Sequence, residues 1–247
     1  MTSHAASPFI TYPPAHARLL FVAEGEVPAE KLIPGSTTTF IATHYAGEGG
    51  GKRGRLPLPS QDTVLSWLAQ ADIHQDTDIV VYDAGNGSHA ARAWWVLNWA
   101  GHHRVWILEG GLKGWQAAAP EEENISSAAG AFREITTEDI ARDPEHFLLV
   151  DARNSKAFAG DGTAPSHLPG AINLPVASLQ DEQGKLLPRE QRKKQIEALG
   201  LTDSSRPVVA YCGSGIASAW LAAALQDLEI DAALYVGSWS AWSAREA

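Results

Sequence analysis

The chain has 247 residues, 45% of them hydrophobic, and a formal net charge of −10 at pH 7. This length and composition suffice for two modest hydrophobic cores, and no segment approaches the roughly 20 apolar residues that a membrane-spanning helix needs. The acidic balance argues against nucleic acid or an anionic membrane as a natural partner.

The first half of the chain contains an ordered series of strand and helix patterns. The apolar run at residues 80–82 predicts a buried strand that ends at Asp83 and leads into a glycine-containing turn. Residues 90–95 follow with a helical pattern, and residues 105–108 read as the next strand. Alternation of strand and helix predicts a mainly parallel sheet.

The second half repeats this order. Residues 207–211 predict a buried strand, Cys212 follows it as Asp83 follows the first strand, and residues 217–228 are rich in alanine and predict a helix. Two copies at this spacing indicate a duplicated α/β protein. We expect two tandem domains, each a mainly parallel sheet with helices on both faces.

A break in the periodic pattern predicts the domain boundary. We expect a first domain at residues 1–118, a linker at residues 119–133 and a second domain at residues 134–247. Ligands of open parallel sheets gather at the carboxyl ends of the strands, where Cys212 would lie. Asp83 stands at the matching point of the first copy and cannot carry sulfane sulfur, so the first domain should be catalytically silent.

Cys212 lies in a turn whose composition favours an anion. Two nearby glycines permit positive φ angles, so that successive amides can converge on one point, and the following helix adds its positive end. A core cysteine would more often lie within a strand or helix. We therefore predict that Cys212 is a nucleophile, held with its thiolate or persulfide by the residues of one loop. These residues are Gly213, Ser214, Gly215, Ile216, Ala217 and Ser218.

Several ordered motifs connect the chain to a known family. They are Asp151-Ala152-Arg153, the stretch 167–173 beginning with His167, the Cys212 loop, the stretch 235–242, and, in the first half, residues 54–59 and 91–95. With them the chain resembles the tandem-domain rhodanese family of thiosulfate and 3-mercaptopyruvate sulfurtransferases over nearly its whole length. The resemblance implies two rhodanese-like domains, the first inactive, and a persulfide formed on Cys212 in the cleft between them.

The resemblance also implies an activity. Sulfane sulfur would pass from a small donor through the Cys212 persulfide to a thiol or cyanide acceptor, with a protein as a further candidate acceptor. A non-enzymatic sulfur relay or regulatory module, which hands sulfur only to a partner protein, is the alternative. A cysteine phosphatase would need an arginine six positions after its cysteine, and Ser218 occupies that position.

The donor is less well defined by the sequence. The Cys212 loop lacks cationic side chains, which within the family favours 3-mercaptopyruvate over thiosulfate. However, Ala157 replaces the arginine with which the family grips its substrate, and Leu32 stands where a histidine is frequent. A different cation would then contact the donor. The candidates are Arg153, Lys156, Arg55 and Arg92.

Other residues have structural interpretations that we weigh beside the functional ones. Arg92 is expected chiefly as a helix-surface or interdomain ion-pair residue, Asp151 and His167 as structural residues, and the Ser214 hydroxyl either as catalytic or as a loop-stabilising group. The aromatic residues Trp239 and Trp242 predict core packing. Residues 47–54, which include Lys52 and Arg53, predict a loop beside the cleft.

Cysteine and histidine content and the first residues bear on compartment and cofactors. A single cysteine excludes an intrachain disulfide, and a reactive thiol is best kept reduced in the cytoplasm. Residues 1–14 lack the charged start and apolar run of a signal peptide. The nine histidines show no metal-ligand spacing. We therefore expect a cytoplasmic protein with no metal and no organic cofactor.

Overall fold

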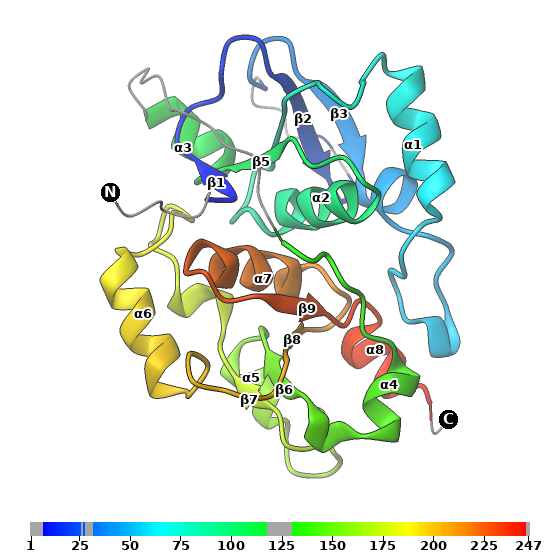
Figure 1. Cartoon of the computed structure of the whole chain (residues 1–247), viewed down its shortest axis with the longest axis vertical. Coiled ribbons are helices and arrows are strands. Elements are labelled where there is room, and N and C mark those ends of the chain that lie inside the picture. The colour runs from blue at the N-terminus through cyan, green and yellow to red at the C-terminus, as the bar shows by residue number, and fades with distance from the viewer. Residues whose placement is uncertain (1–6, 26, 28–31, 118–129, 246–247) are drawn as a thin grey trace.

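The computed structural model describes residues 7–25, 27, 32–117 and 130–245, and most of the expected linker, 119–133, lies outside them. The chain forms two parallel β-sheets, one in each half, with helices on both faces of each sheet (Figure 1). The predicted fold class is confirmed. No helix of the described residues is long and apolar enough to span a membrane.

The first sheet has five parallel strands in the order β1-β5-β4-β2-β3. Its elements are β1 (Phe9–Ile10), β2 (Arg18–Ala23), β3 (Thr37–Phe40), β4 (Ile79–Tyr82), β5 (Val105–Leu108), α1 (Gln61–Gln70), α2 (Ser88–Trp99) and α3 (Gly111–Ala117). All of β4 is buried, as expected of a parallel strand covered on both faces. Val81 packs on the side of α1 and α2, whereas Val80 packs on the side of α3.

The second sheet has four parallel strands in the order β7-β6-β8-β9. Its elements are β6 (Leu148–Asp151), β7 (Ile172–Asn173), β8 (Val208–Tyr211), β9 (Ala232–Leu234), α4 (Thr137–Arg142), α5 (Ser155–Ala159), α6 (Arg189–Ala198), α7 (Ala217–Asp227) and α8 (Ser238–Trp242). The short helical turns of the two halves are η1 (Ile41–Tyr45), η2 (Gly51–Arg53), η3 (Pro144–His146) and η4 (Val176–Ser178). The strand and helix expected on either side of Cys212 correspond to β8 and α7, each within one residue at its ends.

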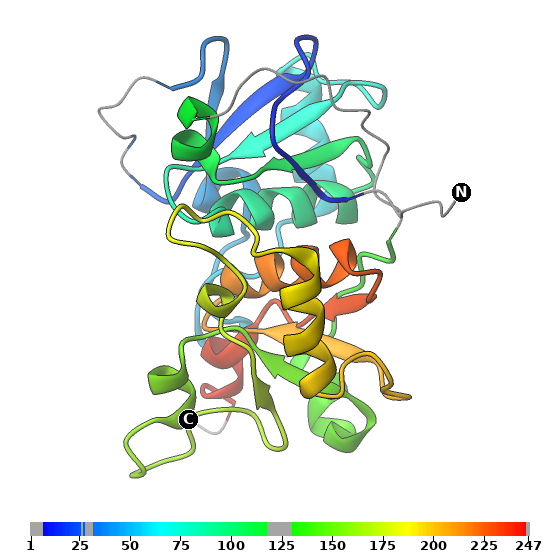
Figure 2. The same cartoon turned by 90° about the vertical axis from the view of Figure 1, so that its left-hand side faces the viewer.

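The two halves meet through α2 and α7, which lie against each other between the sheets (Figures 1 and 2). One continuous hydrophobic core includes Trp94 and Trp95 of α2, Trp220 of α7 and inward-facing residues of both sheets. Because α2 is buried from both sides, its side chains can reach the second half.

Each half also covers the loop that follows the middle strand of the other. The Nε2 atom of Gln180 in the second half donates to the carbonyl of Asn86, 2.6 Å away in the first-half loop. In return, the amide of Arg55 in the first half donates to Oγ of Ser240, at 3.0 Å. A Cβ built on Gly54 would lie 2.8 Å from the carbonyl oxygen of Gly237. The walls around Cys212 therefore come from both halves.

Candidate active site

The sulfur of Cys212 lies at the carboxyl end of β8, beside the start of α7. The residue is 3% exposed. Its Sγ accepts hydrogen bonds from the amide of Gly215, at 3.2 Å, and from the hydroxyl of Ser218, at 3.4 Å. Gly215 has a φ of +81°, which a residue with a Cβ adopts only with strain. The loop thus brings two donors to the one thiol of the chain.

Helix α8 fixes the backbone of this loop from behind. The amides of Trp239 and Ser240 donate to the carbonyls of Cys212 and Gly213, at 2.9 and 3.0 Å. The Cys212 amide donates to Oγ of Ser238, which in turn donates to the carbonyl of Tyr235. Ser238 is fully buried, with a φ of +54°. The sequence does not predict that Ser238 binds the Cys212 amide, because a serine gives no sign that its backbone will have a positive φ.

The corresponding loop of the first half holds an anion of its own. Oδ1 of Asp83 accepts the amides of Gly85 and Gly87, at 2.9 and 3.0 Å. Oδ2 accepts the amides of His89 and Ala90, at 3.0 and 3.1 Å. Asp83 is 2% exposed. The repeated turn can therefore surround a negative charge with amides, and the first copy is filled by a carboxylate.

The two serines of the active loop differ in position. Ser218 is fully buried and donates to the sulfur, whereas Ser214 is half-buried and has no hydrogen bond to the sulfur among the described residues. Of the two interpretations of Ser214, the structure gives no support to the catalytic one. The sequence signal for Ser218 was its place in the first turn of the helix, directly above the thiol.

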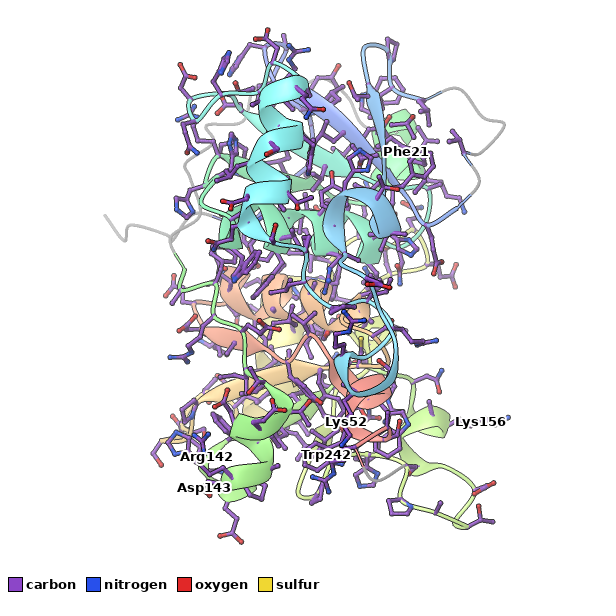
Figure 3. The ribbon with its side chains drawn as sticks, turned by 90° about the vertical axis from the view of Figure 1, so that its right-hand side faces the viewer. Phe21, Lys52, Arg142, Asp143, Lys156 and Trp242 are labelled. Atoms are coloured by element: carbon purple, nitrogen blue, oxygen red, sulfur yellow. The ribbon has the colours of Figure 1, made fainter. Side chains whose placement is uncertain are left out.

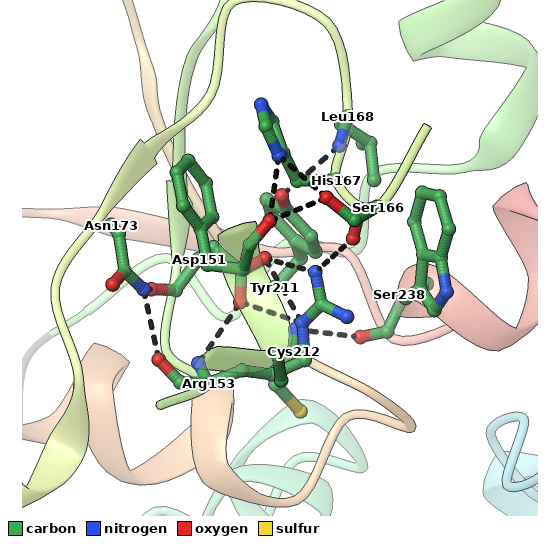
Figure 4. Close-up of polar contacts among 12 residues, drawn as sticks. Asp151, Arg153, Ser166, His167, Leu168, Asn173, Tyr211, Cys212 and Ser238 are labelled. Carbon is green, nitrogen blue, oxygen red and sulfur yellow. Dashed lines mark hydrogen bonds and ion pairs between the residues drawn. The ribbon is translucent and has the colours of Figure 1, made fainter. Parts of the chain in front are cut away.

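Arg153 and Asp151 form one wall of the site. Nε and Nη2 of Arg153 donate to the Asp151 carboxylate at 3.0 and 2.6 Å, and Nη2 also donates to the carbonyl of Ser166 at 2.7 Å (Figure 4). The guanidinium lies 5.3 Å from the ring centre of Trp239. Such paired, forked contacts fix the arginine strongly. Arg153 thus helps to build the wall through its Nε and Nη2 donors.

A pocket of about 580 Å³ opens beside this wall. Arg153, Lys156, Ala157 and Trp239 all line it. Lys156 extends outward at the edge of the second half (Figure 3). Trp239 is half-buried: it packs against the core of the second half, as predicted, and also lines the pocket. Trp242 is buried at 7% exposure, as predicted.

The remaining two candidate arginines come from the first half. Arg55 is exposed, and a Cβ built on Gly213 would lie 3.1 Å from its Nη2, so the guanidinium rests against the active loop. Arg92, by contrast, is fully buried. It donates to four backbone carbonyls and forms no ion pair with a carboxylate of the described residues. The expected helix-surface position of Arg92 is therefore wrong, because α2 is enclosed between the halves. An interdomain contact is present, but through the Gly215 carbonyl.

His167 and Leu168 make contacts that hold their turn in place. Nδ1 of His167 lies 2.9 Å from the carbonyl oxygen of Phe158, and the two rings stack with centres 4.0 Å apart. The Leu168 amide donates to the hydroxyl of Tyr211. These contacts tie the turn to the second sheet. Leu32 is half-buried and packs against the core of the first half.

Two parallel sheets joined in tandem, with a buried cysteine in a glycine-rich loop at the end of a middle strand, define a two-domain rhodanese-type protein. The model of the rhodanese-like domain matches residues 29–118 and 136–245. The chain therefore belongs to the rhodanese family, and it is a sulfurtransferase, since its relatives carry that name.

The relatives are similar over most of the chain. SseB of Mycobacterium tuberculosis, which bears the name of a thiosulfate sulfurtransferase, is 33% identical over 229 residues, 85% of this chain and 80% of the relative. The 3-mercaptopyruvate sulfurtransferase of Escherichia coli is 32% identical over 206 residues, 76% of this chain and 73% of the relative. The human 3-mercaptopyruvate sulfurtransferase is 32% identical over 208 residues, 76% and 70% of the respective chains.

Solved structures agree with this assignment. The structure of SseA from Escherichia coli, a 3-mercaptopyruvate sulfurtransferase, superposes with a TM-score of 0.67 at 28% identity and covers 90% of this chain and 93% of its own. That of the Leishmania major 3-mercaptopyruvate sulfurtransferase superposes with a TM-score of 0.72 at 21% identity, over 93% and 70% of the chains, and shows the shared fold.

Proposed function

We propose that this sulfurtransferase carries sulfane sulfur as a persulfide on Cys212. One observation carries the proposal: the only thiol of the chain accepts hydrogen bonds from the Gly215 amide and the Ser218 hydroxyl. Both donors would stabilise negative charge at the sulfur before and after transfer. The Asp83 carboxylate in the matching loop of the first half supports the same interpretation, since there the amides surround an anion.

In the first step, the Cys212 thiolate attacks the outer sulfur of the donor and forms a new sulfur–sulfur bond. The bond that held this sulfur to the donor breaks, and its electron pair leaves with the remainder. From 3-mercaptopyruvate the carbon–sulfur bond breaks, and the pyruvate enolate takes a proton from solvent. From thiosulfate the sulfur–sulfur bond breaks, and sulfite leaves.

In the second step, a thiolate or cyanide attacks the terminal sulfur of the persulfide. The persulfide bond breaks with its electron pair on Cys212, which restores the thiolate. The acceptor leaves as a persulfide or as thiocyanate. A thiol on a partner protein would react in the same way. Both steps are displacements at sulfur, so the enzyme's contribution is positioning and stabilisation of the sulfur anion.

We propose 3-mercaptopyruvate as the favoured donor, with its carboxylate near Arg55. The loop from Gly213 to Ser218 offers no cationic side chain, and Ala157 supplies none in the adjacent pocket. Arg55 is exposed and rests against Gly213, whereas Nε and Nη2 of Arg153 already bind Asp151 and the carbonyl of Ser166. Lys156 is the other candidate cation.

Mass spectrometry of the intact protein tests the persulfide. With donor and no acceptor, the protein should gain about 32 Da, the mass of one sulfur atom bound by the nucleophile. Cys212→Ser should gain no mass and show no turnover. Turnover in that variant would refute the mechanism.

Steady-state kinetics separate the enzyme from the relay. Continuous turnover of 3-mercaptopyruvate with cyanide would support an enzyme, and the same assay with thiosulfate gives the donor preference. Formation of the persulfide without turnover on any small acceptor would favour a relay to a protein partner.

A further inference from the structure

The first half contributes one buried cation to the second half. The Arg92 guanidinium is fully buried on α2. Nε and Nη2 donate to the carbonyl of Tyr45 at 3.2 and 3.1 Å, and Nη2 donates to the carbonyls of Leu56 and Pro57 at 2.9 and 3.2 Å. Nη1 donates to the carbonyl of Gly215, at 3.4 Å. Arg92 thus joins two parts of the structure: the segment of the first half that carries Arg55, Leu56 and Pro57 (the covering segment), and the loop of residues 212–218 in the second half (the active loop).

We propose that Arg92 is a positioning residue for sulfur transfer, which sets the active loop and provides the positive charge that balances the Cys212 anion. It acts through Cys212, so the inference rests on the proposed function. The link is short: the Gly215 carbonyl accepts from Arg92, and the Gly215 amide donates to Sγ of Cys212. The silent half is thereby part of the catalytic machinery.

The buried charge of Arg92 supports the same role. A buried guanidinium without an anion is costly, and removal from water disfavours its charged form. Burial lowers the pKa of Arg92 to about 10, and the negative charge of Cys212, ahead of that of Glu134, opposes this effect. Carbonyl dipoles satisfy the donors but supply no full negative charge. A thiolate or persulfide at Cys212 supplies it.

The two halves differ in the side chain that approaches each loop from the helix of the other half. In the loop of the first half, α7 approaches through Trp220, whose Nε1 would lie 3.3 Å from a Cβ built on Gly87. The corresponding approach of α2 to the active loop is made by Arg92, whose Nη1 would lie 2.7 Å from a Cβ built on Gly215. The loop with the fixed carboxylate of Asp83 therefore faces an indole, and the loop with the reactive sulfur faces a cation.

Other charged groups also lie around Cys212. Arg55 lies on the covering segment, Arg153 and Asp151 lie at the end of β6, and Glu134 precedes α4. Arg92 also holds the carbonyls of Leu56 and Pro57, so its replacement by Met or Lys releases the segment next to Arg55. A comparison of Arg92→Met with Arg92→Lys, which both lose the forked contacts, therefore isolates the charge of Arg92.

The test uses Arg92→Met, which removes charge and donors, and Arg92→Lys, which keeps the charge but loses the forked donors. Alkylation of the only cysteine with iodoacetamide across pH reports on Cys212 without any sulfur donor, so its outcome does not depend on turnover. In Arg92→Met the rise of the alkylation rate should shift upward by about one pH unit or more, because an opposite charge nearby favours the anion.

Arg92→Lys should keep a profile closer to the wild type. Its kcat should still fall roughly tenfold or more, because a single ammonium cannot hold four carbonyls at once. The KM for the donor should change much less than kcat. If Arg92→Met does not fold, Arg92→Lys decides, and a wild-type kcat in that variant would overturn the positioning role.

Arg192→Met is the matched control, since Arg192 is also a buried arginine but binds Asp227 and the carbonyl of Leu187. It should lower stability and leave the alkylation profile unchanged. An Arg92→Met variant that folds and keeps the wild-type profile overturns the charge-balancing role. Equal shifts in the Arg92 and Arg192 variants would overturn it as well.

Discussion

At the scale of single residues, Ser218 offers a direct test of how the loop holds sulfur. Its hydroxyl donates to Sγ of Cys212, at 3.4 Å. Ser218→Ala removes one donor to a charged sulfur, and we expect kcat/KM to fall by about fivefold to tenfold, the equivalent of roughly 1 kcal/mol. Ser214→Ala removes a hydroxyl without a bond to this sulfur and should cost less. Equal losses in both variants would contradict the assignment.

The missing arginine at Ala157 gives a second prediction, on the donor. A charge-assisted contact contributes about 1.5 to 3 kcal/mol, so Ala157→Arg should lower the KM for 3-mercaptopyruvate roughly tenfold or more. The effect on a neutral persulfide donor should be smaller. Arg55→Ala should raise the KM for 3-mercaptopyruvate. If the wild type binds this donor tightly and neither substitution matters, another cation holds the carboxylate.

Residue identity predicted some of these roles and not others. Cys212 and its loop were recognisable because glycine and helix patterns on either side are local features. The position of Arg92 was not, because whether a helix face meets solvent or a second domain depends on contacts between distant segments. The same holds for Ser238, whose hydroxyl meets the Cys212 amide only in the folded chain.

At the scale of elements, the turn between β4 and α2 has its own structural role. Asp83 receives the amides of Gly85, Gly87, His89 and Ala90. Asp83→Ala leaves buried donors unpaired and should reduce the free energy of unfolding by about 2 to 4 kcal/mol, measured by urea denaturation. The exposed Asp203→Ala serves as control and should change it by less than about 0.5 kcal/mol. A loss as small as the control's would show that water replaces the carboxylate.

The strands and main helices were predictable because each carries a period or a continuous apolar run. Residues 47–54 were expected to form a loop beside the cleft, but the conformation of this segment and its contact with the second half were not predictable. The turn η2 has no apolar period, and its neighbour Gly54 is set by contact with Gly237 of the other half. Such segments take their conformation from the partner domain, which no local pattern encodes.

At the scale of the whole molecule, we expect the stability to depend on pH through Glu109 of the first half, which contacts Leu186 of the second half. Burial raises the pKa of Glu109 above its ordinary value of 4.5, opposed by the Leu186 amide that donates to its carboxylate at 2.7 Å. The folded state therefore binds this proton more tightly than the unfolded chain. The resulting stability is fully present below the ordinary value and is lost as the pH rises through the folded value.

Glu109→Gln removes this titration. Compared with the variant, the wild type should lose stability as the pH rises above the ordinary value of 4.5. Urea denaturation of both proteins at several pH values measures the difference. A difference that is constant with pH would contradict the assignment to Glu109.

Each half covers a loop of the other. We therefore predict that the contact between Gly54 and Gly237 matters for catalysis as well as for stability. Gly54 and Gly35 both have positive φ angles, +79° and +82°, so an alanine at either position is strained. At Gly54 ψ is −178°, a backbone region that essentially only glycine adopts, so an alanine there should cost about 1 to 3 kcal/mol. A Cβ at Gly54 would lie 2.8 Å from the Gly237 carbonyl, whereas nothing lies within 4 Å at Gly35.

Gly54→Ala should therefore displace the segment that carries Arg55 and lower kcat/KM by about tenfold, since small displacements of positioning groups are costly. Gly35→Ala should lose less stability and leave kcat/KM near the wild-type value. Kinetics with 3-mercaptopyruvate, together with urea denaturation of both variants, separate the two effects. If both variants lose activity only in proportion to stability, the first half holds its place around Cys212 without help from this contact.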